Sequence, residues 1–88
     1  MHEASLMKNL MEQIEKLALE NKAERVTGVK VQLGALSHFT PEHFREHFEV
    51  ASRGTKAAEA KLDVKLLDDI QAPDAQNVML ESIEFESV

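Results

Sequence analysis

Residues 26–48 read VTGVKVQLGALSHFTPEHFREHF, and the spacing of apolar residues changes in the middle of this stretch. In its first part, residues 26–34, the apolar Val29, Val31 and Leu33 alternate with polar neighbours. A period of two is typical of a strand with one buried face. The stretch therefore predicts a strand that leads through a turn into a different kind of element.

The second part of the stretch predicts a helix that begins at Thr40. Gly34 gives the backbone the freedom that a turn needs. Thr40 is a favourable N-cap, and Pro41 suits the first helical position. Gly54 is placed to end the helix. The apolar stripe of this helix comprises Phe44, Phe48 and Ala51, while Phe39 before the cap has the spacing of a hydrophobic staple with Phe44.

Working outward towards the N-terminus, residues 4–20 predict a second amphipathic helix. Its apolar residues recur three and four positions apart, as they do on one face of a helix. Its opposite face is polar, with Glu12 and Lys16 in the favourable order for an ion pair one turn apart. The apolar stripe comprises Leu6, Met7, Leu10, Met11, Ile14, Leu17 and Ala18.

Towards the C-terminus, alternation returns in residues 62–66 and again in residues 82–86, and residues 68–77 form a polar connector. Val78 and Leu80 lie on the opposite parity from Ile83 and Phe85, which predicts either a bulge or a late start of the last strand. The order of elements predicts an α+β fold, α-β-α-β-β, with two helices packed on one face of a three-stranded sheet. The expected core comprises Leu10, Ile14, Val31, Leu33, Phe44, Phe48, Val64 and Ile83.

Composition excludes several classes of function. The chain has 88 residues, no cysteine and a net charge of −6, so disulfides and thiolate zinc sites are excluded, and nucleic acid is not an expected partner. Charged side chains interrupt residues 1–20, so neither a signal peptide nor a membrane span is expected, and the expected location is the cytoplasm. No catalytic constellation or phosphate loop is evident, which predicts a protein that is not an enzyme.

The first three residues, Met1, His2 and Glu3, form a candidate metal site. The amine of Met1 can bind one metal ion together with the amide and imidazole nitrogens of His2, closing two adjacent chelate rings in one plane. The amide or carboxylate of Glu3 can fill the fourth position. Planar nitrogen-rich coordination suits Ni(II) or Cu(II) better than zinc. From spacing alone a frayed terminus remains the stronger interpretation, because a histidine near a terminus is common.

Two other histidines, His43 and His47, are one helical turn apart and could share a metal ion. The run between them is not the His-Glu-x-x-His motif of zinc proteases, because position 44 is Phe. Glu42, Arg45 and Glu46 surround the pair. The sequence therefore favours a solvated helix face over a metal site here.

The opening Met1-His2-Glu3-Ala4-Ser5-Leu6-Met7, followed directly by an amphipathic helix, resembles the HypA/HybF family of hydrogenase-maturation nickel metallochaperones. Agreement continues in order and spacing through most of the chain. The matching stretches are Val26-Thr27-Gly28-Val29, Gly34-Ala35-Leu36-Ser37, Pro41-Glu42 to Phe44, Phe48-Glu49, Ser52-Arg53-Gly54-Thr55 and Ser82-Ile83-Glu84-Phe85-Glu86.

The resemblance implies Ni(II) bound by the amine of Met1, by His2 and by Glu3, with His38 as a possible supplementary ligand. It implies delivery of nickel during maturation of a NiFe-hydrogenase or urease, with a GTPase co-chaperone and the hydrogenase large-subunit precursor as partners. An adaptor that docks in a maturation complex without metal chemistry is the alternative.

The chain departs from the family at two places. The family carries a zinc module with paired Cys-x-x-Cys motifs between its last two strands, whereas the connector 68–77 has no cysteine. Thr40 falls near a position where some members place a carboxylate close to nickel. We therefore expect residues 1–88 to form a single nickel-binding domain without structural zinc.

Overall fold

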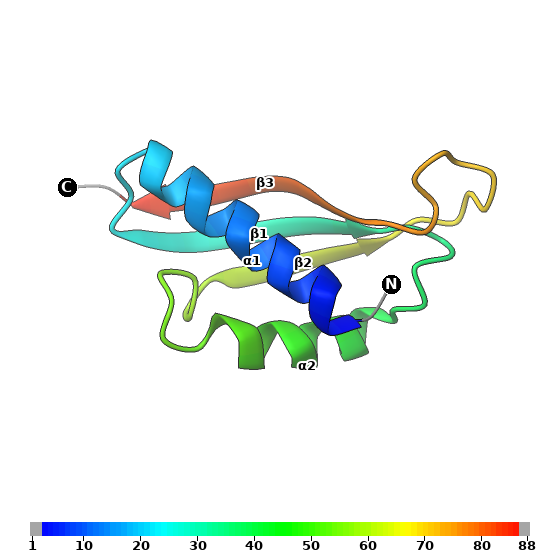
Figure 1. Ribbon diagram of the computed structural model, residues 1–88, viewed down its shortest axis with the longest axis horizontal. Helices are drawn as coiled ribbons and strands as arrows, with labels where there is room; N and C mark the ends of the chain where they lie inside the picture. Colours follow the sequence, from blue (N-terminus) through cyan, green and yellow to red (C-terminus); the bar gives the residue numbers. More distant parts are fainter. Residues whose placement is uncertain (1–2, 87–88) are drawn as a thin grey trace.

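The computed structural model describes residues 3–86, which form two helices and a three-stranded sheet (Figure 1). None of the helices in this part of the chain is long and apolar enough to span a membrane. In chain order the elements are α1 (Glu3–Glu20), β1 (Arg25–Leu33), α2 (Pro41–Ser52), β2 (Lys61–Leu66) and β3 (Val78–Glu86).

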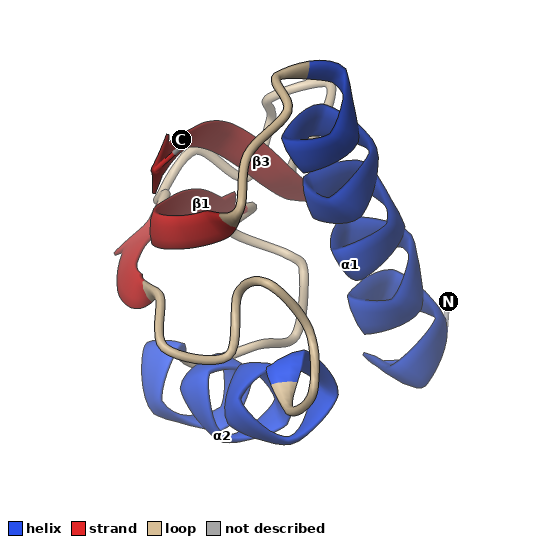
Figure 2. Cartoon of the chain, turned by 90° about the vertical axis from the view of Figure 1, so that its left-hand side faces the viewer, coloured by secondary structure: helices blue, strands red, loops and turns tan. Residues whose placement is uncertain are grey.

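Strand β1 lies in the centre of the sheet, between β2 and β3. It pairs in parallel with β2, because α2 carries the chain back across the sheet between them, and antiparallel with β3. Both helices cover one face of the sheet, and the opposite face is left open (Figure 2). The α+β fold and the α-β-α-β-β order expected from the sequence are confirmed.

The core lies between the helices and this face of the sheet. Six of the eight expected core residues are buried, while Val64 and Ile83 are half-buried and pack against the core from the two outer strands. Outer strands have a neighbour on one side only, so their side chains keep more contact with solvent. The largest fully buried side chains are Phe44, Ile14, Leu33, Val26, Val29 and Val31.

Of the two alternatives for the last strand, a bulge or a late start, the structure shows the bulge, because β3 already begins at Val78. Val31 pairs with Leu80, whereas the preceding residue, Lys30, pairs with Ser82, so β3 has one extra residue at this point. The extra residue moves Val78 and Leu80 into phase with Ile83, and all three pack on the core.

Gly34 is needed for a reason that differs from the expected one. Its φ angle is not in the left-handed region, where Gly54 lies at 76°. Instead, the connector approaches so closely that a Cβ atom at position 34 would lie 2.2 Å from the carbonyl oxygen of Ala75. The Gly34 amide donates to the Asn77 carbonyl at 2.9 Å, and the Leu36 amide donates to the Ala75 carbonyl at 2.7 Å. The connector is therefore docked against the loop between β1 and α2.

Candidate metal centre

Helix α2 is fixed at its start and along its side. The hydroxyl of Thr40 accepts a hydrogen bond from the His43 amide at 3.1 Å, which confirms the expected N-cap. Further along, the Arg45 guanidinium donates to the Leu62 carbonyl of β2 at 2.8 Å. These contacts set the rotation of α2, and with it the direction in which its histidines point.

His43 and His47 face each other on α2. Their Nε2 atoms are 2.9 Å apart and their ring centroids 4.6 Å apart. Both side chains are half-buried. Glu42, Arg45 and Glu46 around them are exposed, as expected of a solvated helix face, whereas the two histidines are partly withdrawn from solvent.

Phe39 explains why the two imidazoles are partly withdrawn from solvent. Its buried ring packs edge-on against Phe44, with centroids 5.4 Å apart, as the hydrophobic staple predicts. The same ring lies 5.7 Å from the His43 ring and 6.1 Å from the His47 ring. The two histidines are thus held between the aromatic side chain that precedes α2 and the surface.

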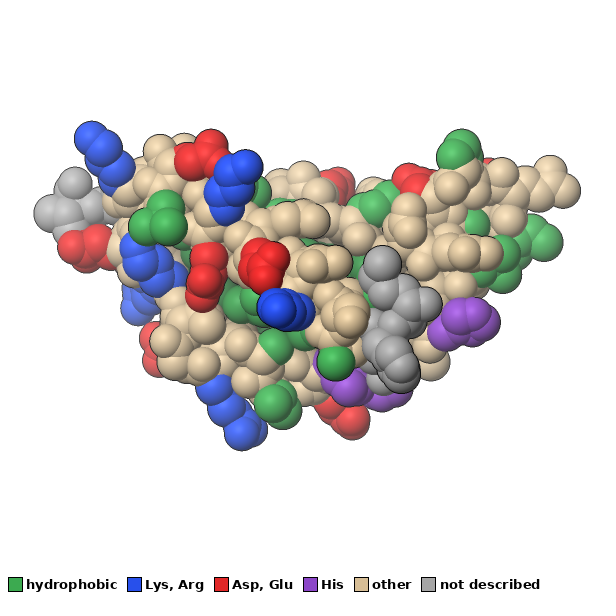
Figure 3. Space-filling model, viewed as in Figure 1, with side chains coloured by type: hydrophobic (Ala, Val, Ile, Leu, Met, Phe, Trp, Pro, Cys, Tyr) green, Lys and Arg blue, Asp and Glu red, His purple; other side chains and the backbone are tan. Residues whose placement is uncertain are grey.

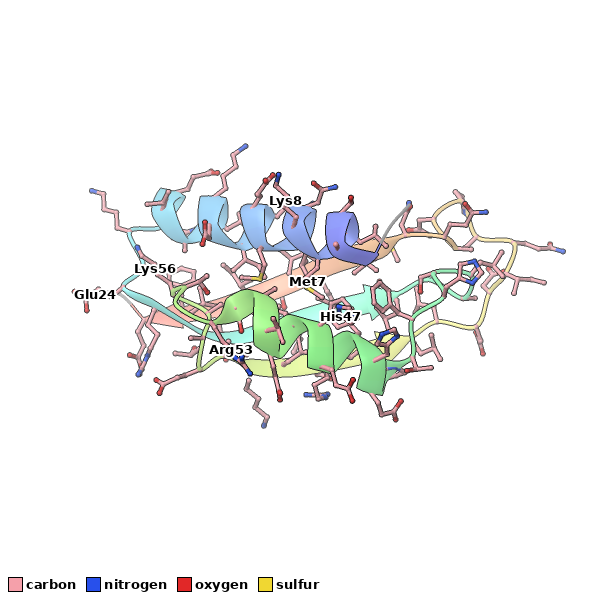
Figure 4. All side chains as sticks on the ribbon, turned by 60° about the horizontal axis from the view of Figure 1, so that its bottom comes forward. Met7, Lys8, Glu24, His47, Arg53 and Lys56 are labelled. Carbon is pink, nitrogen blue, oxygen red and sulfur yellow. The ribbon has the colours of Figure 1, made fainter. Side chains whose placement is uncertain are left out.

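The start of α1 lies against this part of α2. A groove between the two helices is lined by Ala4, Met7 and Lys8 on one side and by Glu46, His47, Val50 and Ala51 on the other. Met7 and His47 both lie in the space between the helices (Figure 4). Because Ala4 directly follows Glu3, the fold brings the beginning of the described chain close to His47.

His38 lies in the loop between β1 and α2. It is exposed, and its φ of 66° puts it in the left-handed region. Histidine is one of the few residues that are enriched there. Its neighbour Phe39 is buried in the core, so the two adjacent side chains point in opposite directions. On the face shown in Figure 3, the histidine side chains lie in the right-hand half of the molecule and the visible lysine and arginine side chains in the left-hand half.

The predicted ligands Met1 and His2 lie outside the described residues. Glu3 opens α1, but its side chain is also outside the description. Among the side chains that are described, no three of histidine, aspartate or glutamate come together to enclose a metal ion. The described part of the chain therefore provides two converging imidazoles, and a complete site requires further donors.

Two converging imidazoles are chemically suited to hold a metal ion. Imidazole nitrogens suit Ni(II), Cu(II) and Zn(II), and two of them one helical turn apart can chelate a single ion. The sequence shows the spacing of the two histidines but does not show that their rings converge. Phe39 is the residue in the sequence that points to this convergence. Its hydrophobic-staple spacing with Phe44 places an aromatic ring beside both histidines.

The chain is similar to proteins of known family. Residues 1–73 match the family described as hydrogenase/urease nickel incorporation, metallochaperone, hypA. The hydrogenase maturation factor HypA of Rhodopseudomonas palustris strain TIE-1 is 39% identical over 64 residues, which cover 73% of this chain and 57% of that protein. HypA of Archaeoglobus fulgidus is 38% identical over 66 residues, which cover 75% and 60%. The chain thus matches little more than half the length of these relatives.

Solved structures share the fold. The solution structure of the Ni metallochaperone HypA from Helicobacter pylori superimposes with a TM-score of 0.80 at 21% identity, covering all of both chains. A second solution structure of a HypA protein gives a TM-score of 0.75 at 20% identity and covers 99% of this chain and 98% of that one. On the strength of the family match over residues 1–73, this chain belongs to the HypA family of hydrogenase/urease nickel-incorporation metallochaperones.

Proposed function

We propose that this protein binds Ni(II) through the amine of Met1, the imidazole and amide of His2 and a donor from Glu3. It delivers the ion during maturation of a nickel enzyme such as NiFe-hydrogenase or urease. The observation that carries the proposal is the family match, which begins at residue 1 and so includes all three ligands. The proposal requires Met1 to carry a free amine.

The local structure supports this chemistry at the start of α1. Glu3 is the first residue of the helix, and the first N–H groups of a helix have no acceptor within it. The amide of Glu3 is therefore not tied up in the helical ladder. The positive end of the helix dipole also favours anionic groups. It stabilises a deprotonated amide or a carboxylate here, and both are good nickel donors.

As a carrier, the protein has to release its cargo. A chelate built at the end of the chain can be dismantled one donor at a time, so a partner can take the ion by ligand exchange. We propose a GTPase co-chaperone and the precursor of the hydrogenase large subunit, or urease, as these partners. The protein works in the cytoplasm and catalyses no reaction of its own.

Residues 1–88 act in this proposal as one nickel-binding domain without structural zinc. The connector, in which no cysteine occurs, is docked on the loop between β1 and α2 through backbone hydrogen bonds. Backbone hydrogen bonds therefore hold the connector against this loop. This feature also favours the alternative function, an adaptor that keeps the docking surfaces of a maturation factor and does not bind nickel tightly.

Nickel titration with and without a blocked N-terminus tests the proposal. Protein with a free Met1 amine should bind Ni(II) in a planar geometry that gives a characteristic absorption spectrum. A Gly-Ser-Gly extension removes the amine but keeps every side chain, and His2→Ala removes one imidazole. Each change should weaken nickel binding more than tenfold, which corresponds to about 1.4 kcal/mol. Binding should also weaken as the pH falls, because nickel has to displace protons from its donors.

The matched control is His38→Ala, which tests the supplementary ligand separately and should have the smaller effect. If the extended protein keeps the planar spectrum with unchanged affinity, the amine is not a ligand and the proposed site is wrong. If even the free-amine protein shows no planar nickel complex, the adaptor function replaces the carrier function.

A further inference from the structure

The N-terminal chelate proposed above does not include the two histidines on α2. We propose that His43 and His47 form a second site for a divalent transition-metal ion, which binds Ni(II) through both Nε2 atoms. The site stands on the geometry of the pair and is independent of the Met1 amine. It is a separate binding position beside the start of α1, on the groove that Ala4 and His47 both line.

The distance between the two Nε2 atoms allows both to bind the same metal ion. Imidazole nitrogens bind such metals at about 2.0–2.1 Å, so two bonds at a right angle separate the nitrogens by about 2.9 Å and two at the tetrahedral angle by about 3.3 Å. The observed Nε2–Nε2 distance is 2.9 Å, the length of the hydrogen bond that joins the two rings. Both nitrogens can therefore reach one ion with little movement of either side chain, and imidazole nitrogens suit Ni(II) and Cu(II).

The pair is held in place before any metal arrives. The backbone of His43 is tied to the Thr40 cap, and both rings contact the buried Phe39. Rotamer freedom that is already lost does not have to be lost on binding, which favours the complex. In a flexible, fully exposed pair the two side chains would have to be ordered by the metal itself.

Binding requires a small rearrangement of protons. In the neutral pair one ring donates its Nε2 proton to the lone pair of the other Nε2. A metal needs a lone pair on both atoms, so the donating ring becomes the tautomer that carries its proton on Nδ1. The two imidazoles then replace one hydrogen bond by two metal–nitrogen bonds, with no net release of protons, and water fills the remaining coordination positions.

Protein with the Gly-Ser-Gly extension provides the test, because its N-terminal amine is blocked. Ni(II) is titrated into it by calorimetry, and the imidazole signals are followed in ¹⁵N-edited spectra. We expect about one bound ion per chain, with the ring signals of His43 and His47 changing together and before that of His38. Ring signals that stay unchanged while the ion binds elsewhere would overturn the proposal.

Substitutions provide the second measurement. His43→Gln and His47→Gln should each lower the nickel affinity of the extended protein at least tenfold, since a chelate of two donors then loses one. Glu49→Gln is the control, because Glu49 is an exposed residue of the same helix, and it should leave the affinity unchanged. Equal affinity in all three variants would refute the site. Circular dichroism shows whether the variants are folded, and where one is not, the ring signals of the unsubstituted extended protein decide.

The two proposals fail separately. Loss of the planar complex in free-amine protein, with the His43 and His47 signals still responding in extended protein, would refute the N-terminal chelate and leave the second site standing. The reverse pattern would refute the second site alone.

Discussion

The two helices begin in opposite ways. Helix α2 starts at a capped end, where the hydroxyl of Thr40 accepts a hydrogen bond from the His43 amide. Pro41 occupies the first helical position, at which a missing N–H costs nothing. Helix α1 starts at Glu3, directly after the two residues proposed as nickel ligands. One helix end therefore serves stability, and the other is proposed to serve binding.

The difference follows from one property that all helices share. The first N–H groups have no partner inside the helix and must find one elsewhere. In α2 a side chain of the protein satisfies one of them. In α1 we propose that the same unsatisfied, electropositive end favours anionic donors around a metal ion. Substitutions in the two helices and removal of metal can show whether one end serves stability and the other serves binding.

The largest effect is expected where the two helices do not differ, in the shared core. Phe44→Ala in α2 should lower the free energy of unfolding by about 3–5 kcal/mol, and Ile14→Ala in α1 by about 2–5 kcal/mol. Both side chains are 1% exposed. Leu19→Ala is the control, because Leu19 is 69% exposed, and it should change stability by less than about 0.5 kcal/mol. Denaturant unfolding measures all three. A small loss for either buried residue would show that its helix is not held by the core.

A smaller loss of stability is expected from a substitution at Gly34, in the loop that leads to the capped end of α2. Gly34→Ala would place its Cβ 2.2 Å from the Ala75 carbonyl oxygen and force the connector away. We expect a loss of about 1–3 kcal/mol, the usual cost of overpacking. Gly28→Ala is the matched control, because its Cβ would meet Glu84 at an ordinary 3.5 Å. Equal unfolding midpoints for the two variants would show that the connector is not tightly docked.

Breaking the cap of α2 should separate stability from binding. Thr40→Ala should cost about 1 kcal/mol, because the His43 amide loses its acceptor, while Thr40→Ser keeps the hydroxyl and most of that stability. Nickel affinity at the N-terminus should stay the same in both variants. A tenfold weaker planar complex in Thr40→Ala would mean that the two helix ends are coupled, and the comparison would have to be abandoned.

No effect at all is expected from removing metal. If the start of α1 binds a cargo and the fold needs no structural ion, a strong chelator should leave the midpoint of thermal unfolding unchanged. The measurement is a thermal melt of the free-amine protein with and without chelator, followed by circular dichroism. A large drop on chelation would reveal a structural metal site.

Much of the fold was predictable because it depends on local patterns. Alternation identified β1 and β2, and the Thr40-Pro41 pair located the start of α2. The parity change before Ile83 predicted an irregularity, a bulge or a late start, and the structure has the bulge. The family resemblance also came from residues in order along the chain. The proposed ligands Met1, His2 and Glu3 belong to this class, because their chelate rings are closed by neighbours in the sequence.

Other features depended on parts of the chain that meet only in the folded protein. The role of Gly34 is set by the connector, whose Ala75 lies far along the sequence. Val64 and Ile83 alternate like buried residues, but the strand order puts them on the outer strands, where they are half-buried.

The histidine pair depends on both the local sequence and the tertiary structure. The sequence by itself determined that His43 and His47 are one turn apart on a capped helix, because that follows from the period of the α-helix. Only the tertiary structure decided that their Nε2 atoms converge to 2.9 Å beside Phe39 and the start of α1. The physical reason is that spacing along a helix fixes direction, whereas burial and rotamer depend on what packs against it.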